Sequence, residues 1–178
     1  QELRDEIVSA GLPRFRADQL YRWLYDTGVS TFDDCMNLPR DLRSALQERY
    51  RIAHPILADD QESTDGTRKF LFTLEDGTRV ETVLIPAESL EPGQPRRLTI
   101  CVSTQVGCPL DCKFCATASM KLKRNLSVGE ILGQVHEVQK RSEQRITNLV
   151  FMGMGEPLLN YENVMATVDL LTDEQLNG

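Results

Sequence analysis

Long apolar runs are missing from this sequence of 178 residues. No stretch approaches the roughly 20 apolar residues that a membrane-spanning helix requires. The first residues also lack the basic-then-apolar order of a secretory signal peptide. These absences argue against a membrane protein and predict a soluble, cytoplasmic protein with no membrane partner.

The chain contains few cysteines, and their number, five, is odd. Three of the five fall within eight residues, whereas a disulfide framework usually shows an even number of spaced cysteines. The pattern therefore favours a metal site in a reducing compartment. Cys35 lies far from the others among helix-forming residues, and we expect it to be a small buried apolar side chain.

Basic residues are fewer than acidic residues, 20 against 27, and the net charge is −7. This balance argues against a protein that coats nucleic acid through bulk charge. Residues 96–147 are an exception, because they contain nine basic and four acidic side chains. Such a block would attract a polyanion, although solvated surface charges without a binding role would give the same count.

The first two parts of the chain differ in their apolar spacing. Residues 1–60 have the spacing and turn signals of short helices, with Thr31 and Asp34 as a capping pair and Pro39 as the first residue of a helix. Residues 61–95 contain two β-rich segments, 68–74 and 78–85, around an Asp-Gly turn, and then a proline-rich linker. We expect a small helical domain followed by a β-hairpin.

The third part, residues 96–178, alternates strand and helix. Strands are expected near 98–103 and 148–152, and helices after a capping box at Ser127 and near 162–171. This order predicts parallel strands with right-handed crossovers. The fold class is therefore α/β, a partial (β/α) barrel or open sheet after a small all-α domain and a hairpin. Two such units cannot close a barrel, which predicts a truncated larger domain.

The third part also contains a cysteine cluster, Gly-Cys-Pro-Leu-Asp-Cys-Lys-Phe-Cys, at residues 107–115. Its thiols belong to Cys108, Cys112 and Cys115. An iron–sulfur cubane with three cysteine ligands keeps one iron open for a substrate or cofactor. Zinc would need a fourth ligand from Cys101, His54 or His136, and an oxidised or purely structural cysteine group is the remaining alternative.

The cysteine motif resembles the radical S-adenosylmethionine (SAM) signature, C-x3-C-x-aromatic-C, with Phe114 as the aromatic residue. Residues 153–157, Gly-Met-Gly-Glu-Pro, resemble the glycine-rich SAM contact of that superfamily. Further segments are similar to a family of dual-specificity methyltransferases, which modify C2 of an adenosine in large-subunit ribosomal RNA and in transfer RNA. These segments are residues 105–108, 113–115, 124–126, 146–148 and 152–160. The similarity extends along essentially the whole chain, including an N-terminal domain that resembles a helix-hairpin-helix RNA-binding module.

The resemblance implies two cofactors. The three clustered cysteines would hold a 4Fe–4S cluster, and the chain would be the beginning of a radical SAM core. Gly155 and Glu156 would bind SAM, and Phe114 would belong to the cofactor-binding residues.

The resemblance also implies two catalytic residues. Glu81 would act as a base, and Cys101 would be the resolving cysteine that releases the methylated RNA. By composition alone, Glu81 is a solvent-facing strand residue and Cys101 a buried one.

The implied partners are large-subunit ribosomal RNA, transfer RNA and an electron donor such as flavodoxin, with the protein acting as a monomer. In the family, a methylated cysteine near the C-terminus carries the methyl carbon. No cysteine follows Cys115, so this chain alone is not expected to complete a turnover. Two alternatives stay open: a sibling family that methylates C8 of the adenosine, and a zinc-stabilised RNA-binding module without catalysis.

Overall fold

A computed structural model describes residues 2–9, 12–87 and 97–173. The chain divides into two compact units, which we describe separately: Gln1–Ala53 with Val168–Gly178, and His54–Thr167. None of the helices in the described ranges is both long and apolar enough to cross a membrane.

The first unit is helical. Its elements are α1 (Glu2–Ser9), α2 (Arg14–Arg22), a π-helical turn (Trp23–Thr27), a short 3-10 helix (Phe32–Asp34) and α3 (Arg40–Arg49). Gly28 ends the π-helical turn that continues α2, and it adopts the left-handed conformation, with φ 65°. The apolar core contains Ile7, Ala17, Leu20, Phe32, Cys35, Leu38 and Leu46. The buried position expected for Cys35 is confirmed, and burial, together with the charge of Asp34, raises the pKa of its thiol to about 11.

The second unit is built on a five-stranded sheet with the order β1-β2-β3-β4-β7. The strands are β1 (Ile56–Glu62), β2 (Arg68–Thr73), β3 (Arg79–Ala87), β4 (Arg97–Cys101) and β7 (Asn148–Val150). The first four strands pair antiparallel, and β4 pairs parallel with β7, as the strand–helix alternation predicts. No described strand pairs with the other side of β7.

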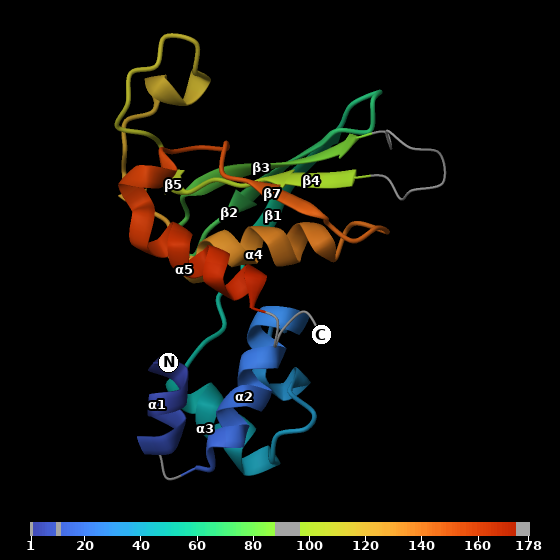
Figure 1. Ribbon diagram of the computed structural model, residues 1–178, viewed down its shortest axis with the longest axis vertical. Coiled ribbons are helices and arrows are strands. Elements are labelled where there is room, and N and C mark those ends of the chain that lie inside the picture. The colour runs from blue at the N-terminus through green and yellow to red at the C-terminus, as the bar shows by residue number, and fades with distance from the viewer. Residues whose placement is uncertain (1, 10–11, 88–96, 174–178) are drawn as a thin grey trace. The chain divides into compact units, whose positions relative to one another are not determined.

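Helices cover one face of this sheet. Figure 1 shows α4 (Val128–Gln139) beneath the strands, with α5 (Tyr161–Thr172) beside it. Alternate residues of the strands point into this layer and form an apolar core; they include Phe70, Phe72, Val80, Leu84, Leu98 and Ile100. The other face of the sheet carries no helix within the described residues, and a site can therefore form there.

A second ribbon projects the cysteine motif away from the sheet. It pairs β5 (Gln105–Val106) with β6 (Arg124–Asn125) in antiparallel fashion. The segment between them contains a 3-10 helix, Ala116–Ser119, and extends beyond the sheet at the upper left of Figure 1. We call residues 107–123 the cysteine loop.

Three details differ from the sequence-based expectations. Pro39 is the N-cap of α3 rather than its first helical residue. Pro86 lies in β3 and not in the linker, because β3 extends past β2 there and pairs only with β4. The first strand, β1, was not expected, since its acidic and exposed residues give no apolar alternation. Residues 88–95 of the linker expected over 86–95 lie outside the described residues, and the domain boundaries at 60 and 95 stay a prediction.

Candidate functional site

The cysteine loop is closed at its base by backbone contacts. The Cys108 N–H donates to the Met120 carbonyl at 3.1 Å, and Cys108 also forms a β-bridge with Lys121. Gly107, with φ +78°, fits here because a Cβ atom would lie 2.3 Å from the Lys121 carbonyl oxygen. The backbone of Cys108 is therefore positioned by contacts within the protein alone.

The three thiols of the loop are free and accessible to different degrees. Cys115 is exposed, and Cys108 and Cys112 are partly buried. The Cys115 N–H donates to the Cys112 carbonyl at 3.0 Å, which folds the two residues into one turn. Phe114 is 94% exposed, an unusual position for a large aromatic side chain.

The donor chemistry of this loop fits an iron–sulfur cluster. Three cysteines without disulfides lie on one closed loop, and thiolates are the ligands that such clusters use. Across the part of the chain that the structure describes, no group of three or more His, Cys, Asp or Glu side chains is gathered closely enough to hold a metal ion. The cluster, and the roles of the three cysteines, are therefore proposals.

The glycine-rich turn at 153–157 packs against the chain just before the cysteine loop. A Cβ atom on Gly153 would lie 2.7 Å from the Val102 carbonyl carbon. Gly155 has φ +103°, and its Cβ atom would lie 2.6 Å from Gln105 Cβ. In this structure the two glycines allow one backbone segment to approach another, which is a structural reason for them independent of any ligand.

Glu156 begins the 3-10 helix Pro157–Asn160 as its N-cap. Its carboxylate Oε1 accepts a hydrogen bond from the Leu158 N–H at 3.0 Å, and its own N–H donates to Gln105 Oε1 at 2.9 Å. The carboxylate is partly buried and its Oε1 already has a partner. A bound amino group would therefore have to share this carboxylate with the helix cap.

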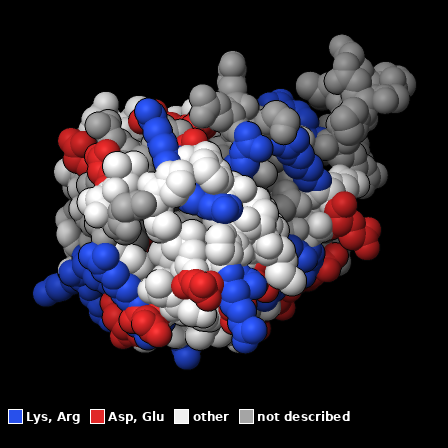
Figure 2. All heavy atoms as spheres, turned by 90° about the horizontal axis from the view of Figure 1, so that it is seen from below, with Lys and Arg blue, Asp and Glu red and all other residues white. Residues whose placement is uncertain are grey.

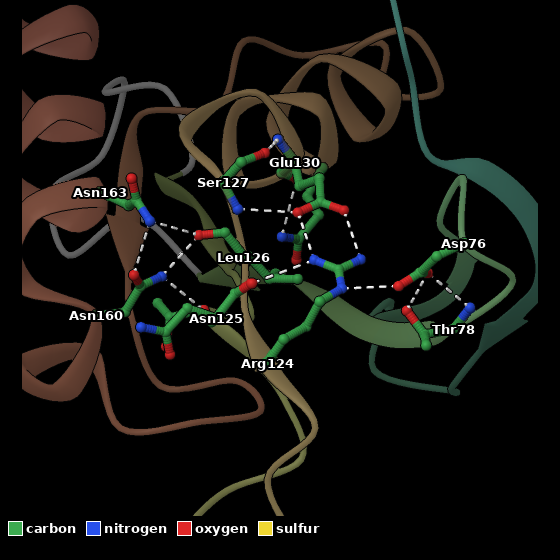
Figure 3. Close-up of polar contacts among 11 residues, drawn as sticks. Asp76, Thr78, Arg124, Asn125, Leu126, Ser127, Glu130, Asn160 and Asn163 are labelled. Carbon is green, nitrogen blue, oxygen red and sulfur yellow. Dashed lines mark hydrogen bonds and ion pairs between the residues drawn. The ribbon is translucent and has the colours of Figure 1, made fainter.

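Arg124 closes the exit of the cysteine loop (Figure 3). Its guanidinium forms two hydrogen bonds with the Glu130 carboxylate, at 2.9 and 2.8 Å, and a third with Asp76 at 2.7 Å. Glu130 also completes the capping box of α4 with Ser127, as the sequence predicts. One side chain thus joins the loop exit, the start of α4 and the β2–β3 turn.

These contacts shift the pKa values of the partners. Arg124 and Thr78 hold the pKa of the Asp76 carboxyl well below its usual range. Burial by itself would raise the pKa of Glu130, but hydrogen bonds from Arg124 and Ser127 have the larger combined effect. The net result is that the pKa of Glu130 is lowered. Both carboxylates are therefore ionised at neutral pH, and the network persists.

Glu81 and Cys101 lie on the sheet face that the helices do not cover. Cys101 is directly opposite Val83 on β3, and Glu81 is two residues from Val83, so alternation places all three on one face. Glu81 Oε1 lies 3.3 Å from Lys69 Nζ. Burial raises the pKa of the Cys101 thiol, although a hydrogen bond with the Met152 backbone opposes this effect.

Ser103 links Glu81 to the glycine-rich turn. Its hydroxyl donates to the Glu81 carbonyl at 2.6 Å and accepts from the Met154 N–H at 2.9 Å. The buried Gln134 amide holds Ser103 in turn, accepting from its N–H at 2.9 Å and donating to its carbonyl at 3.0 Å. Sequence reasoning missed both residues. The available signal was a run of polar residues, 103–105, directly after an apolar strand.

The basic block around the loop is partly neutralised. Lys113, Arg124 and Arg141 each form an ion pair with a carboxylate. The exposed Lys121 and Lys123 form no ion pair within the described residues. In the view from below, Figure 2 shows Lys and Arg side chains interspersed with Asp and Glu, without a continuous patch of one sign. On the cysteine loop itself, the exposed Lys121 and Lys123 are therefore the side chains that could attract a polyanion.

Known proteins match both units. Residues 1–52 match the family described as the Ribosomal RNA large subunit methyltransferase N-terminal domain, and residues 102–177 match the Radical SAM superfamily. A Salinibacter ruber protein named probable dual-specificity RNA methyltransferase RlmN is 46% identical over 97% of this chain and 47% of its own length. The chain belongs to the RlmN family. A Thermotoga maritima RlmN of the same description is 44% identical over 100% of the chain and 50% of its own length.

The fold of this RlmN family member has a solved counterpart. A crystal structure of a radical SAM methyltransferase from Sphaerobacter thermophilus matches 98% of the chain and 50% of that protein, with a TM-score of 0.84 and 39% identity. The prediction of an incomplete radical SAM core of the α/β class is confirmed. The chain spans about half the length of the curated RlmN relatives it matches.

Proposed function

We propose that the protein containing this chain methylates C2 of an adenosine in large-subunit ribosomal RNA and in transfer RNA by radical SAM chemistry. The proposal rests on one observation, which is that the cysteine loop and the glycine-rich turn begin at the same edge of the sheet. The free thiols of the cysteine loop and the turn with Glu156 leave the sheet at the carboxyl ends of the parallel strands β4 and β7. Ligands of open α/β sheets bind at that edge.

In this proposal the three loop cysteines hold a 4Fe–4S cluster, while Gly155 and Glu156 bind SAM. A bound cluster would supply one electron to SAM, whose cleavage gives methionine and a 5′-deoxyadenosyl radical. The chain itself provides the closed loop that presents three thiols, and the carboxylate of Glu156 next to it. Phe114, which is exposed, stands between two of the proposed ligands in the sequence and would belong to the cofactor-binding residues.

Glu81 and Cys101 have their proposed roles on the open sheet face. The Glu81 carboxylate, whose Oε1 lies 3.3 Å from Lys69 Nζ, would accept the C2 proton of the adenine. The Cys101 thiolate would attack the sulfur of the methyl-carrying cysteine, which this sequence does not contain, and form a disulfide. The bond from that sulfur to the carbon on the adenine would break, and the carbon would keep the electron pair and take up a proton, which gives the methyl group. Since its thiol pKa is raised, Cys101 must lose its proton to a base before it reacts.

Large-subunit ribosomal RNA and transfer RNA are the proposed substrates, and a reductant such as flavodoxin is the proposed electron donor. A base that reacts at an aromatic carbon must leave the stack. Lys121 and Lys123 would contact phosphates close to such a base, because their charges are not neutralised within the described residues.

Anaerobic reconstitution of the full-length protein tests the cofactor part. We expect iron and sulfide close to a 4Fe–4S content, and loss of both when Cys112 is replaced by alanine. Cys35→Ala is the matched control, because Cys35 is fully buried in the helical unit and is no ligand. One zinc and no iron per chain would instead establish the alternative of a zinc-stabilised RNA-binding module.

Mass spectrometry of ribosomal and transfer RNA from cells lacking the gene tests the reaction. We expect loss of 2-methyladenosine and its return when the full-length gene is restored. Loss of 8-methyladenosine would assign the protein to the sibling chemistry. Unchanged methylation would refute the proposed function.

A further inference from the structure

Gln105 is a fully buried amide at the entrance of the cysteine loop, three residues before Cys108. A buried amide costs free energy unless its polar atoms are hydrogen-bonded, and an apolar side chain could fill the same space without that cost. Both polar atoms of this amide form hydrogen bonds. Oε1 accepts from the Glu156 N–H at 2.9 Å, and Nε2 donates to Asn125 Oδ1 at 2.8 Å.

Asn125 completes the arrangement from the other strand of the ribbon. It lies directly opposite Gln105 in the β5–β6 pair, next to Arg124 at the loop exit (Figure 3). Its Nδ2 donates to the Leu159 carbonyl at 3.2 Å. The two residues at the base of the cysteine loop therefore hold residues 156–159 at both ends.

The aliphatic part of Gln105 adds a steric contact. Its Cβ and Cγ atoms fill the space that a side chain on Gly155 would need, and its N–H donates to the Met154 carbonyl at 3.2 Å. Hydrogen bonds and packing together leave the turn little freedom to move relative to the loop.

We infer that Gln105 and Asn125 are positioning residues that fix the Glu156 segment relative to the cysteine loop. The inference rests on the proposed function, in which SAM contacts Glu156 and a cluster held by the loop. Neither residue needs to touch the cofactor. They hold Glu156 and the cysteine loop at a fixed distance from each other before SAM binds. Binding then costs less conformational entropy.

The test uses the full-length, reconstituted protein and three variants. Gln105→Met removes both hydrogen bonds of the amide while keeping a flexible side chain of similar length. Asn125→Ala removes the second anchor at an exposed position, where folding is not at risk. Gln139→Met is the matched control, because the partly buried Gln139 amide also makes two hydrogen bonds, accepting from the Ile146 N–H and donating to the Gln144 carbonyl, away from the glycine-rich turn. The measurements are the Kd for SAM by equilibrium dialysis, iron per chain, and hydrogen exchange of residues 156–159.

Loss of the amide's hydrogen bonds should weaken SAM binding roughly tenfold in Gln105→Met, which frees the Glu156 N–H, and less in Asn125→Ala. Iron content should stay unchanged, and exchange in residues 156–159 should become faster. The Gln139→Met control should lose stability but keep its SAM affinity and the slow exchange of residues 156–159.

Equal SAM affinity in wild type and both variants would overturn the inference, as would a parallel loss of iron, which indicates general collapse of the loop. A wild-type protein without iron would instead refute the proposed function. In that case the exchange measurement still decides whether the two side chains anchor the turn.

Discussion

The close approach of Gly155 to the entrance of the cysteine loop predicts a graded response to three alanine substitutions. Gly155→Ala would combine an unfavourable φ of +103° with a Cβ atom 2.6 Å from Gln105 Cβ. The backbone conformation costs about 1–3 kcal/mol for a residue with a side chain. Displacing the packed Gln105 side chain adds about 1–3 kcal/mol. We expect the free energy of unfolding to fall by roughly 2–6 kcal/mol.

Two other glycines separate the contributions. Gly77 has φ +77° with no atom within 4 Å of the added Cβ, so Gly77→Ala should cost only the conformational part, about 1–2 kcal/mol. Gly129 lies in α4 with open space and no positive φ, so Gly129→Ala should stabilise by about 0.5–1 kcal/mol.

Urea unfolding followed by far-UV circular dichroism measures all three changes. Fluorescence is less suitable, because Trp23, the single tryptophan, belongs to the helical unit rather than to the unit that contains these glycines. If Gly155→Ala is no less stable than Gly77→Ala, the proposed steric contact does not exist in solution.

Three further measurements test other parts of the site. Ser127→Ala should lower the unfolding free energy by about 1 kcal/mol in urea titrations, because the N-cap hydroxyl of α4 is lost; an unchanged midpoint would contradict the capping box. Alkylation of Cys101, followed by peptide mass spectrometry, should reach half its maximal rate at a higher pH in the native chain than in the urea-unfolded chain, because only the thiolate reacts and burial raises the thiol pKa; coincident pH profiles would speak against this burial. In the full-length protein, Lys121→Ala and Lys123→Ala should each lower the slope of log Kd for RNA against log salt concentration by about 0.7–0.9, and an unchanged slope would remove these lysines from the RNA contact.

Local signals in the sequence predicted several elements correctly. The Asp-Gly turn fixed the β2–β3 hairpin, and the Ser127 capping box marked the start of α4. These features depend on residues close together in the chain, whose backbone preferences act without tertiary contacts. The acidic β1 gave no such signal, because a strand at the edge of a sheet is defined by its neighbour.

The reactive side chains of the site were predictable from the sequence, but the hydrogen bonds that join its segments were not. The spacing of the three clustered cysteines and the Gly-Met-Gly-Glu-Pro turn were visible in the sequence, and the family they indicated is confirmed. The roles of Gln105, Ser103 and Arg124 were not visible. Each of these polar side chains joins segments tens of residues apart, so its partners exist only after folding.

The sequence by itself therefore determined the reactive groups and the family, because side-chain chemistry and short spacings survive in an unfolded chain. Only the tertiary structure decided which of those groups share a surface. It placed Glu81 and Cys101 on one face of the sheet through strand register, and it joined Glu156 to the cysteine loop through a buried amide. Register and burial depend on contacts between distant segments, and no local pattern specifies them.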